Sequence, residues 1–146
     1  MSSRIGFVIS PEVFMMTQKP PEYIPVSYGP VRMVEKVWGV EYWLENNDEY
    51  CGKILAVNAG FTSSLHYHKK KNETFLVLSG LCRLVFDDVT FGLNAGARIT
   101  IPAGVRHRFY VKKSDARGCK ILELSTHHDD KDVVRLEESR ALNYGE

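Results

Sequence analysis

Residues 60–80, GFTSSLHYHKKKNETFLVLSG, decide how this chain is expected to fold. The stretch begins and ends with glycine and holds three potential metal ligands within eight residues: His66, His68 and Glu73. Side chains alternate between the two faces of a β-strand, so His66 and His68 are expected to point the same way. A short connection then leads to Glu73 at the start of the next strand. The pattern predicts three ligands that project into one interior from neighbouring strands.

A second stretch, residues 96–107 (GARITIPAGVRH), supplies a fourth potential ligand, His107. The turn at Pro102–Gly104 places His107 at the start of another strand. Three histidines and one carboxylate form a mixed nitrogen and oxygen donor set that suits zinc, manganese, iron, nickel or cobalt. We therefore expect one divalent metal ion bound by the four residues. The alternative is that they are ordinary polar residues of the surface or core.

The chain from Val31 onward consists of short segments rich in β-branched and aromatic residues, separated by turn signals. These segments are Met33–Trp38, Val40–Leu44, Lys53–Asn58, Thr74–Leu78, Leu81–Phe86, Arg98–Ile101, His107–Val111 and Lys120–Ser125. Such a series without intervening amphipathic helices predicts an all-β antiparallel sandwich or barrel. Residues 129–142 (DDKDVVRLEESRAL) predict one short C-terminal helix, because acidic residues stand at its start.

Residues 1–33 differ from the rest, because they hold five of the six prolines and show no sustained periodicity. Each proline removes a backbone donor, which makes long internal strands unfavourable. The segment is expected to be an arm that packs across a barrel domain of residues 34–146. The sharper alternative is an arm that is exchanged with a second subunit in a homodimer, by addition of a strand to the sheet.

Length and composition limit the class of protein. A chain of 146 residues predicts one domain, and a net charge of +1 argues against a general nucleic-acid binder. No apolar run approaches the roughly 20 residues that span a bilayer, and the run around Phe7–Ile9 is too short for a signal peptide. Three widely spaced cysteines do not form a disulfide framework. We expect a cytoplasmic protein without membrane or nucleic-acid partners.

The two glycine-bounded stretches resemble the two motifs of the cupin superfamily. The first motif, G-x5-H-x-H-x3–4-E-x6-G, is matched at each spacing by Gly60, His66, His68, Glu73 and Gly80. The second, G-x5-P-x-G-x2-H-x3-N, is matched by Gly96, Pro102, Gly104 and His107, with Val111 where asparagine is usual. The resemblance implies a double-stranded β-helix, or jelly roll, with the metal inside the mouth of the barrel.

The sequences that flank these motifs resemble a narrower family. Residues 35–41 (EKVWGVE), 121–126 (ILELST) and 129–135 (DDKDVVR) are similar to segments that open and close the C-terminal isomerase domain of bacterial type II mannose-6-phosphate isomerase/mannose-1-phosphate guanylyltransferase enzymes. This resemblance implies aldose–ketose isomerisation of a sugar or sugar phosphate, through an enediolate that the metal stabilises. The same donor set also serves an Fe(II)-dependent dioxygenase or a non-catalytic metal- or sugar-binding module, and both alternatives stay open.

An isomerase needs a base within reach of the substrate. Glu123 is the first candidate, because it shares a strand face with Cys119 and Ile121, where burial tends to raise the pKa of a carboxyl group. Glu41 is the second candidate. For both residues the alternative is an ordinary solvated glutamate on an outer strand.

Three further residues are candidates for binding the substrate. Arg135 matches the closing arginine of the narrower family, which implies bidentate binding of a phosphate or of sugar hydroxyls. Lys70 lies in a run of three lysines beside the metal-bearing hairpin and would attract an anionic substrate. Trp38 offers a stacking surface. Each has an ordinary alternative: Arg135 would be a solvated arginine, Lys70 part of a solvated turn and Trp38 a core residue.

Overall fold

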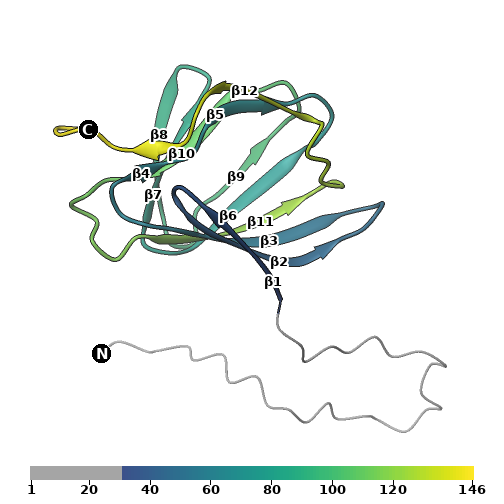
Figure 1. Cartoon of the computed structure of the whole chain (residues 1–146), viewed down its shortest axis with the longest axis horizontal. Coiled ribbons are helices and arrows are strands. Elements are labelled where there is room, and N and C mark those ends of the chain that lie inside the picture. The colour runs from purple at the N-terminus through teal and green to yellow at the C-terminus, as the bar shows by residue number, and fades with distance from the viewer. Residues whose placement is uncertain (1–30) are drawn as a thin grey trace, which may run out of the picture. The chain divides into compact units, whose positions relative to one another are not determined.

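The computed structural model describes residues 31–146, which form two antiparallel sheets that face each other (Figure 1). The first sheet has six strands in the order β1 (Arg32–Lys36), β2 (Gly39–Asn46), β3 (Cys51–Val57), β11 (Cys119–Ser125), β6 (Glu73–Ser79) and β9 (Arg98–Ile101). The second sheet has seven strands. Five of them follow in the order β12 (Val133–Glu137), β5 (Leu65–His68), β10 (His107–Val111), β4 (Phe61–Thr62) and β13 (Arg140–Ala141). The other two branch from β10, since β7 (Leu81–Phe86) pairs with β10 and β8 (Val89–Asn94) pairs with β7. The predicted all-β architecture is confirmed.

The inward-facing residues of several strands change from apolar at one end to polar at the other. Along β11 the buried residues are Cys119, Ile121 and Glu123, and along β10 they are His107, Phe109 and Val111. The register aligns these gradients, since Ile121 lies opposite Leu55 of β3 and Glu123 opposite Lys53. β6 repeats the pattern with Glu73, Phe75 and Val77. One end of the interior is therefore an apolar core, and the other end is a polar cavity.

The strand predictions agree with the structure to within two residues at each end for all eight expected segments. The alternation of apolar residues specified most of these strands, because one face of each is buried; β1 is the exception, since none of its residues is fully buried. The short strands β4 and β5 and the exposed strand β8 were not among them. β8 is exposed, although its sequence alternates Val89, Phe91 and Leu93 with polar or small residues and so carried a strand signal that the prediction did not use.

The predicted helix over residues 129–142 is wrong, because this segment contains strands β12 and β13. β12 pairs with β5, which places Val133 opposite His68 and Arg135 opposite His66. The β-branched pair Val133–Val134 suits a strand, and the hydrogen bonds to β5 outweigh the weak helix preference of the acidic residues. The correction concerns the site directly, since β12 forms part of the mouth of the cavity.

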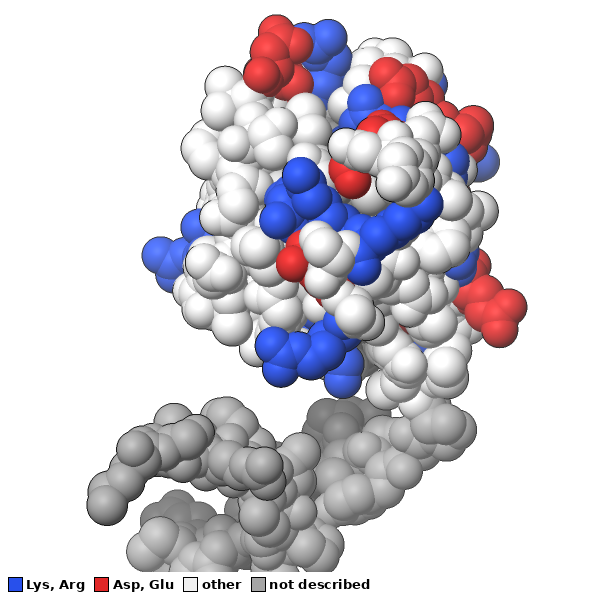
Figure 2. Space-filling view, turned by 90° about the vertical axis from the view of Figure 1, so that its left-hand side faces the viewer, with Lys and Arg blue, Asp and Glu red and all other residues white. Residues whose placement is uncertain are grey.

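An ion pair joins the C-terminal strand β12 to the barrel in addition to backbone hydrogen bonds: Arg108 of β10 lies 2.8 Å from a carboxylate oxygen of Glu137. A second ion pair lies within the C-terminal segment, where Arg140 is 2.8 Å from a carboxylate oxygen of Glu146. Figure 2 views this side of the domain, where basic side chains gather in several groups with acidic side chains beside some of them. The charge of this face is thus partly compensated within the domain.

The described part of the chain begins at Val31, and its first strand, β1, begins at Arg32. The proposed exchange of that arm between subunits concerns residues that lie outside the described part of the chain. Among residues 31–146, no helix is long and apolar enough to cross a bilayer.

Candidate metal centre and its cavity

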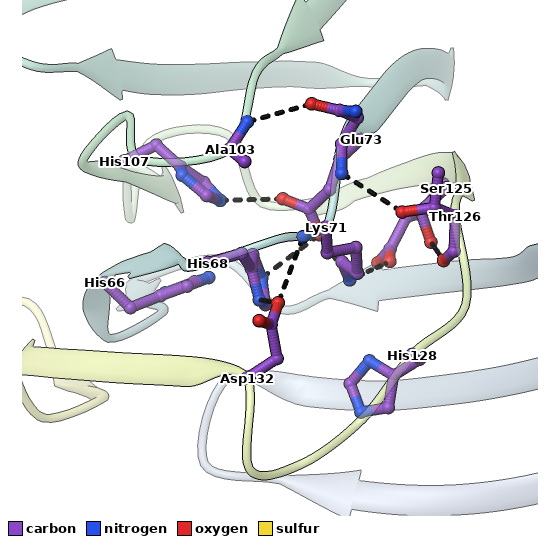
Figure 3. A network of polar contacts seen from close by, with 12 residues as sticks. His66, His68, Lys71, Glu73, Ala103, His107, Ser125, Thr126, His128 and Asp132 are labelled. Atoms are coloured by element: carbon purple, nitrogen blue, oxygen red, sulfur yellow. Dashed lines mark hydrogen bonds and ion pairs between the residues drawn. The ribbon is translucent and has the colours of Figure 1, made fainter.

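The four predicted ligands come together at the polar end of the barrel. His66 and His68 project from β5, Glu73 from the start of β6 and His107 from the start of β10. Their potential ligand atoms all lie within 4.8 Å of one another. His68, Glu73 and His107 are at most 5% exposed. Figure 3 shows the side chains converging from the separate strands. The sequence therefore predicted the composition of this cluster correctly.

Backbone carbonyl groups orient two of the histidine rings. Nδ1 of His66 lies 2.9 Å from the carbonyl oxygen of Ser64, and Nδ1 of His107 lies 3.0 Å from that of Val105. A carbonyl only accepts hydrogen bonds, so Nδ1 carries the proton in both rings. The lone pair of each Nε2 is then free to bind a cation, as in metal sites whose histidines are fixed by a second layer of groups.

Asp132 lies beside the third histidine, His68, whose buried Nδ1 has no hydrogen-bond partner within the described residues. Its Oδ2 lies 3.5 Å from Nδ1 of the His68 ring. The carboxylate is itself fixed, because it accepts hydrogen bonds from the backbone N–H groups of Lys70 and Lys71 at 2.9 and 3.1 Å. Sequence analysis missed this residue, since it placed Asp132 in a helix. The β-branched pair Val133–Val134 was a local sign of a strand, but nothing in the sequence indicated that Asp132 lies beside His68.

The donor atoms fit a divalent cation. Nε2 of His107 and Oε2 of Glu73 are buried and lie 2.9 Å apart, yet neither has a hydrogen-bond partner of suitable geometry. Buried polar atoms without partners are costly, and a cation between these donors would satisfy them. Three imidazole nitrogens and one carboxylate suit zinc, manganese, iron, nickel or cobalt, as the sequence predicted.

The protonation states also suit metal binding. Burial and the neighbouring His107 lower the pKa of His66 to about 3, so the ring is neutral at physiological pH. Burial alone would raise the pKa of Glu73. The neighbouring imidazoles of His107 and His68, together with the positive charge of Lys71, outweigh the effect of burial and hold the pKa of Glu73 well below the usual range. The site thus offers a neutral imidazole and an ionised carboxylate.

A buried ion pair stands behind the candidate ligands. Nζ of Lys71 lies 2.5 Å from Oε1 of Glu73 and donates to Oε1 of Glu123 at 2.7 Å. Burial favours the neutral amine, but the charges of Glu123 and Glu73 overcome it and raise the pKa of Lys71. Glu123 is 4% exposed, so the prediction that it faces inward is confirmed and the solvated alternative is wrong.

The lysine run is divided between two environments. Lys71 lines the cavity, whereas Lys70 is exposed and borders a separate surface depression. The structure thus does not bring Lys70, the predicted substrate-binding lysine, to the cavity. The two lysines differ because Lys71 forms ion pairs with Glu73 and Glu123. The run of three lysines in the sequence does not show which of them makes these contacts.

The sheet that carries Glu73 and Glu123 continues through β3 and β2, which line the cavity together with the loop before β12. Glu41 of β2 accepts a hydrogen bond from Nε1 of Trp43 at 3.0 Å. Lys53 of β3 is 1% exposed, and its Nζ lies 3.2 Å from Nδ1 of His128. Burial and the charge of Lys53 lower the pKa of His128. Sequence analysis missed Lys53 and His128. A signal for Lys53 existed, since it alternates in phase with the core residues Leu55 and Val57.

The two remaining candidates lie at different depths. Trp38, in the turn between β1 and β2, is 5% exposed and packs edge-on against Phe109 with ring centroids 5.0 Å apart. It is a core residue that also borders the cavity. Arg135 is exposed on β12 and lines the cavity mouth. The cavity is partly open to solvent and has a volume of about 110 Å³.

Comparison with known proteins establishes the family. The cupin domain family matches residues 53–125, which include both motifs and span half of the chain, and this protein belongs to it. Among curated proteins, the chain is similar to the xanthan biosynthesis protein XanB of Xanthomonas campestris, with 26% identity over 110 residues. The match covers 74% of this chain but 23% of XanB.

Solved structures show the same fold. Oxalate decarboxylase from Bacillus subtilis is 14% identical, with a TM-score of 0.63, over 73% of this chain and 30% of that one. A cupin-2 domain protein from Shewanella frigidimarina is 26% identical, with a TM-score of 0.51, over 62% of this chain and 82% of that one. These likenesses support the jelly-roll architecture of the cupin barrel.

Proposed function

We propose that this protein is a metal-dependent cupin enzyme that interconverts the aldose and ketose forms of a sugar or sugar phosphate. The observation that carries the proposal is a buried carboxylate, Glu123, in the same cavity as the His66, His68, Glu73 and His107 cluster. The similarity to XanB and the likeness of the flanking segments to type II mannose-6-phosphate isomerases point to sugar chemistry.

The proposed reaction moves a proton between two adjacent carbons. A divalent ion held by the four ligands would stabilise negative charge that develops on the substrate oxygens at C1 and C2. Glu123 would take the proton from C2 and return it to C1, as a positioned general base and acid. Lys71 donates a hydrogen bond to Glu123 at 2.7 Å and so holds that carboxylate in place. Glu41 is the alternative base, because it borders the same cavity.

The experiment begins with elemental analysis of the full chain, purified without added metal or an affinity tag. The protein is then loaded with manganese, cobalt, nickel or zinc and incubated with mannose 6-phosphate or fructose 6-phosphate in D₂O. Isomerisation through proton transfer incorporates deuterium at the exchanged carbon, which NMR detects. We expect exchange by the loaded wild type, its loss in Glu123→Gln and its persistence in the surface variant Glu49→Gln.

Two outcomes would reject the proposal. Oxygen consumption by an iron-loaded sample, without deuterium exchange, would indicate a dioxygenase. Saturable sugar binding without exchange under any metal would indicate a binding module. Retention of full exchange in Glu123→Gln and its loss in Glu41→Gln would keep the isomerase and transfer the role of the base to Glu41.

A further inference from the structure

Two lysines are buried in the cavity wall, and their surroundings differ sharply. Lys71 is 4% exposed and contacts two carboxylates, those of Glu73 and Glu123, at 2.5 and 2.7 Å. Lys53 is 1% exposed, but its nearest carboxylate oxygen, on Glu41, lies 3.7 Å away. Within the described residues, the only hydrogen bond of its ammonium group is to the His128 ring. Lys71 is fully compensated, whereas Lys53 is not.

The geometry around Lys53 leaves donors free. An ammonium group carries three N–H donors, and one of them is used by Nδ1 of His128. The ring of Trp43 covers another side, with Nζ 3.9 Å from its centroid, as a cation–π contact. The remaining capacity is available to a group in the cavity that Lys53 lines. Burial of an incompletely paired charge is costly, so a ligand that supplied the missing acceptor would be bound strongly.

The structure also holds Lys53 and His128 in fixed positions. The side-chain amide of Asn46 donates to the carbonyl group of His128 at 3.1 Å and accepts from its N–H group at 2.9 Å. Nε2 of the His128 ring lies 3.0 Å from Oδ1 of Asp130. Because that carboxylate accepts the Nε2–H, Nδ1 is left as the acceptor for Lys53. His128 thus positions the lysine without neutralising its charge.

The charges of the whole cavity favour the same kind of ligand. The basic and acidic side chains in its lining are equal in number: Lys36, Lys53, Lys71 and Arg135 against Glu41, Glu73, Glu123 and Asp130. A divalent ion at the four metal ligands would add two positive charges to this balanced lining. A cavity with surplus positive charge attracts anions.

We propose that Lys53 binds a compact anionic group of the substrate, a phosphate or a carboxylate, at the wall formed by β2 and β3. This wall contains none of the four metal ligands, so the substrate would extend from the metal centre to Lys53. The inference rests on the proposed function and deepens it, because it names the substrate as anionic. It also assigns the anion to Lys53 instead of to the exposed residues Lys70 and Arg135.

Calorimetric titration of the metal-loaded full chain tests the assignment with three probes: mannose 6-phosphate, glucuronate and uncharged mannose. We expect Lys53→Met to weaken binding of the charged probe about tenfold or more, the effect of losing a charge-assisted hydrogen bond. Lys53→Arg should retain part of the affinity. Lys36→Met is the matched control, since it removes the same charge from a side chain that is 34% exposed at the same cavity, and we expect a change below about twofold.

The outcomes separate the possible anions and the possible failures. Tighter binding of mannose 6-phosphate than of glucuronate would assign a phosphate, and the reverse would assign a carboxylate. Three results would overturn the proposal: unchanged affinity in Lys53→Met, an equal loss in Lys36→Met, or no binding of either charged probe to the loaded wild type. Thermal unfolding of each variant verifies that it is folded.

Deuterium exchange on the same samples distinguishes this inference from the proposed function. Anion binding that depends on Lys53, without exchange, would keep the anion site and reject the isomerase. Deuterium exchange that is unchanged in Lys53→Met would support the isomerase proposal and reject the anion site.

Discussion

The two walls of the cavity are built in different ways. The metal wall takes all four ligands from two short motifs, and each charge there has a close partner, as Lys71 has in Glu73 and Glu123. The wall formed by β2 and β3 combines Glu41 and Lys53 with His128 from a distant part of the chain, and the nearest carboxylate oxygen to its ammonium group lies 3.7 Å away. The difference indicates that the four ligands are suited to bind a cation, whereas the neighbouring wall around Lys53 is suited to bind an anion.

The largest expected effect concerns the metal wall. The double variant His66→Ala/His107→Ala removes two of the four donors, so we expect metal content to fall from about one ion per chain to less than about a tenth of that. Elemental analysis after dialysis measures it. His127→Ala is the control, because that histidine is exposed and lies outside the cluster. Full retention of metal by the double variant would show that the cluster is not the site.

The second prediction compares the two buried lysines directly. In the metal-free protein, Lys71→Met leaves two buried carboxylates without their partner, and we expect a loss of about 3–5 kcal/mol in the free energy of unfolding. Lys53→Met removes a poorly paired buried charge, so its effect should stay within about 1 kcal/mol. Urea denaturation measures both. Equal losses would contradict the distinction between a compensated and an uncompensated lysine.

The third prediction is a pH dependence that originates in the metal wall. The pKa of His66 is about 3 in the folded protein, against 6.5 for an unperturbed histidine. Between these values the unfolded chain binds more protons, so the metal-free protein should lose stability as the pH falls below 6.5. The contribution is fully present above 6.5. Denaturation between pH 7.5 and 4.5 should show a shallower decline in His66→Gln, and identical slopes would argue against a neutral, buried His66.

The smallest expected effect concerns the loop that carries His128. Asn46→Ala removes two partly buried hydrogen bonds to the backbone of His128, which should cost about 1–2 kcal/mol. Hydrogen exchange should become faster in residues 126–130, while the strands of the metal wall remain protected. Faster exchange throughout the barrel would show instead that the loop does not respond separately.

The sequence predicted the site unevenly, and the reason is the range of the contacts. His66, His68, Glu73 and His107 were found because strand alternation and turn residues act over a few positions. The inward orientation of Glu123 followed from its phase with Ile121. The C-terminal helix was predicted wrongly, since the pairing of β12 with β5 is a long-range contact that outweighs local preference.

The sequence by itself determined that the chain forms a β-barrel whose motifs gather three histidines and a glutamate. Only the tertiary structure decided which lysine lies in the cavity and what faces the metal centre. Lys53 and His128 are 75 positions apart, and they meet because β3 and β11 pair in a register that brings the following loop back over the barrel. Such a contact depends on closure of the whole sheet, and no local pattern encodes it.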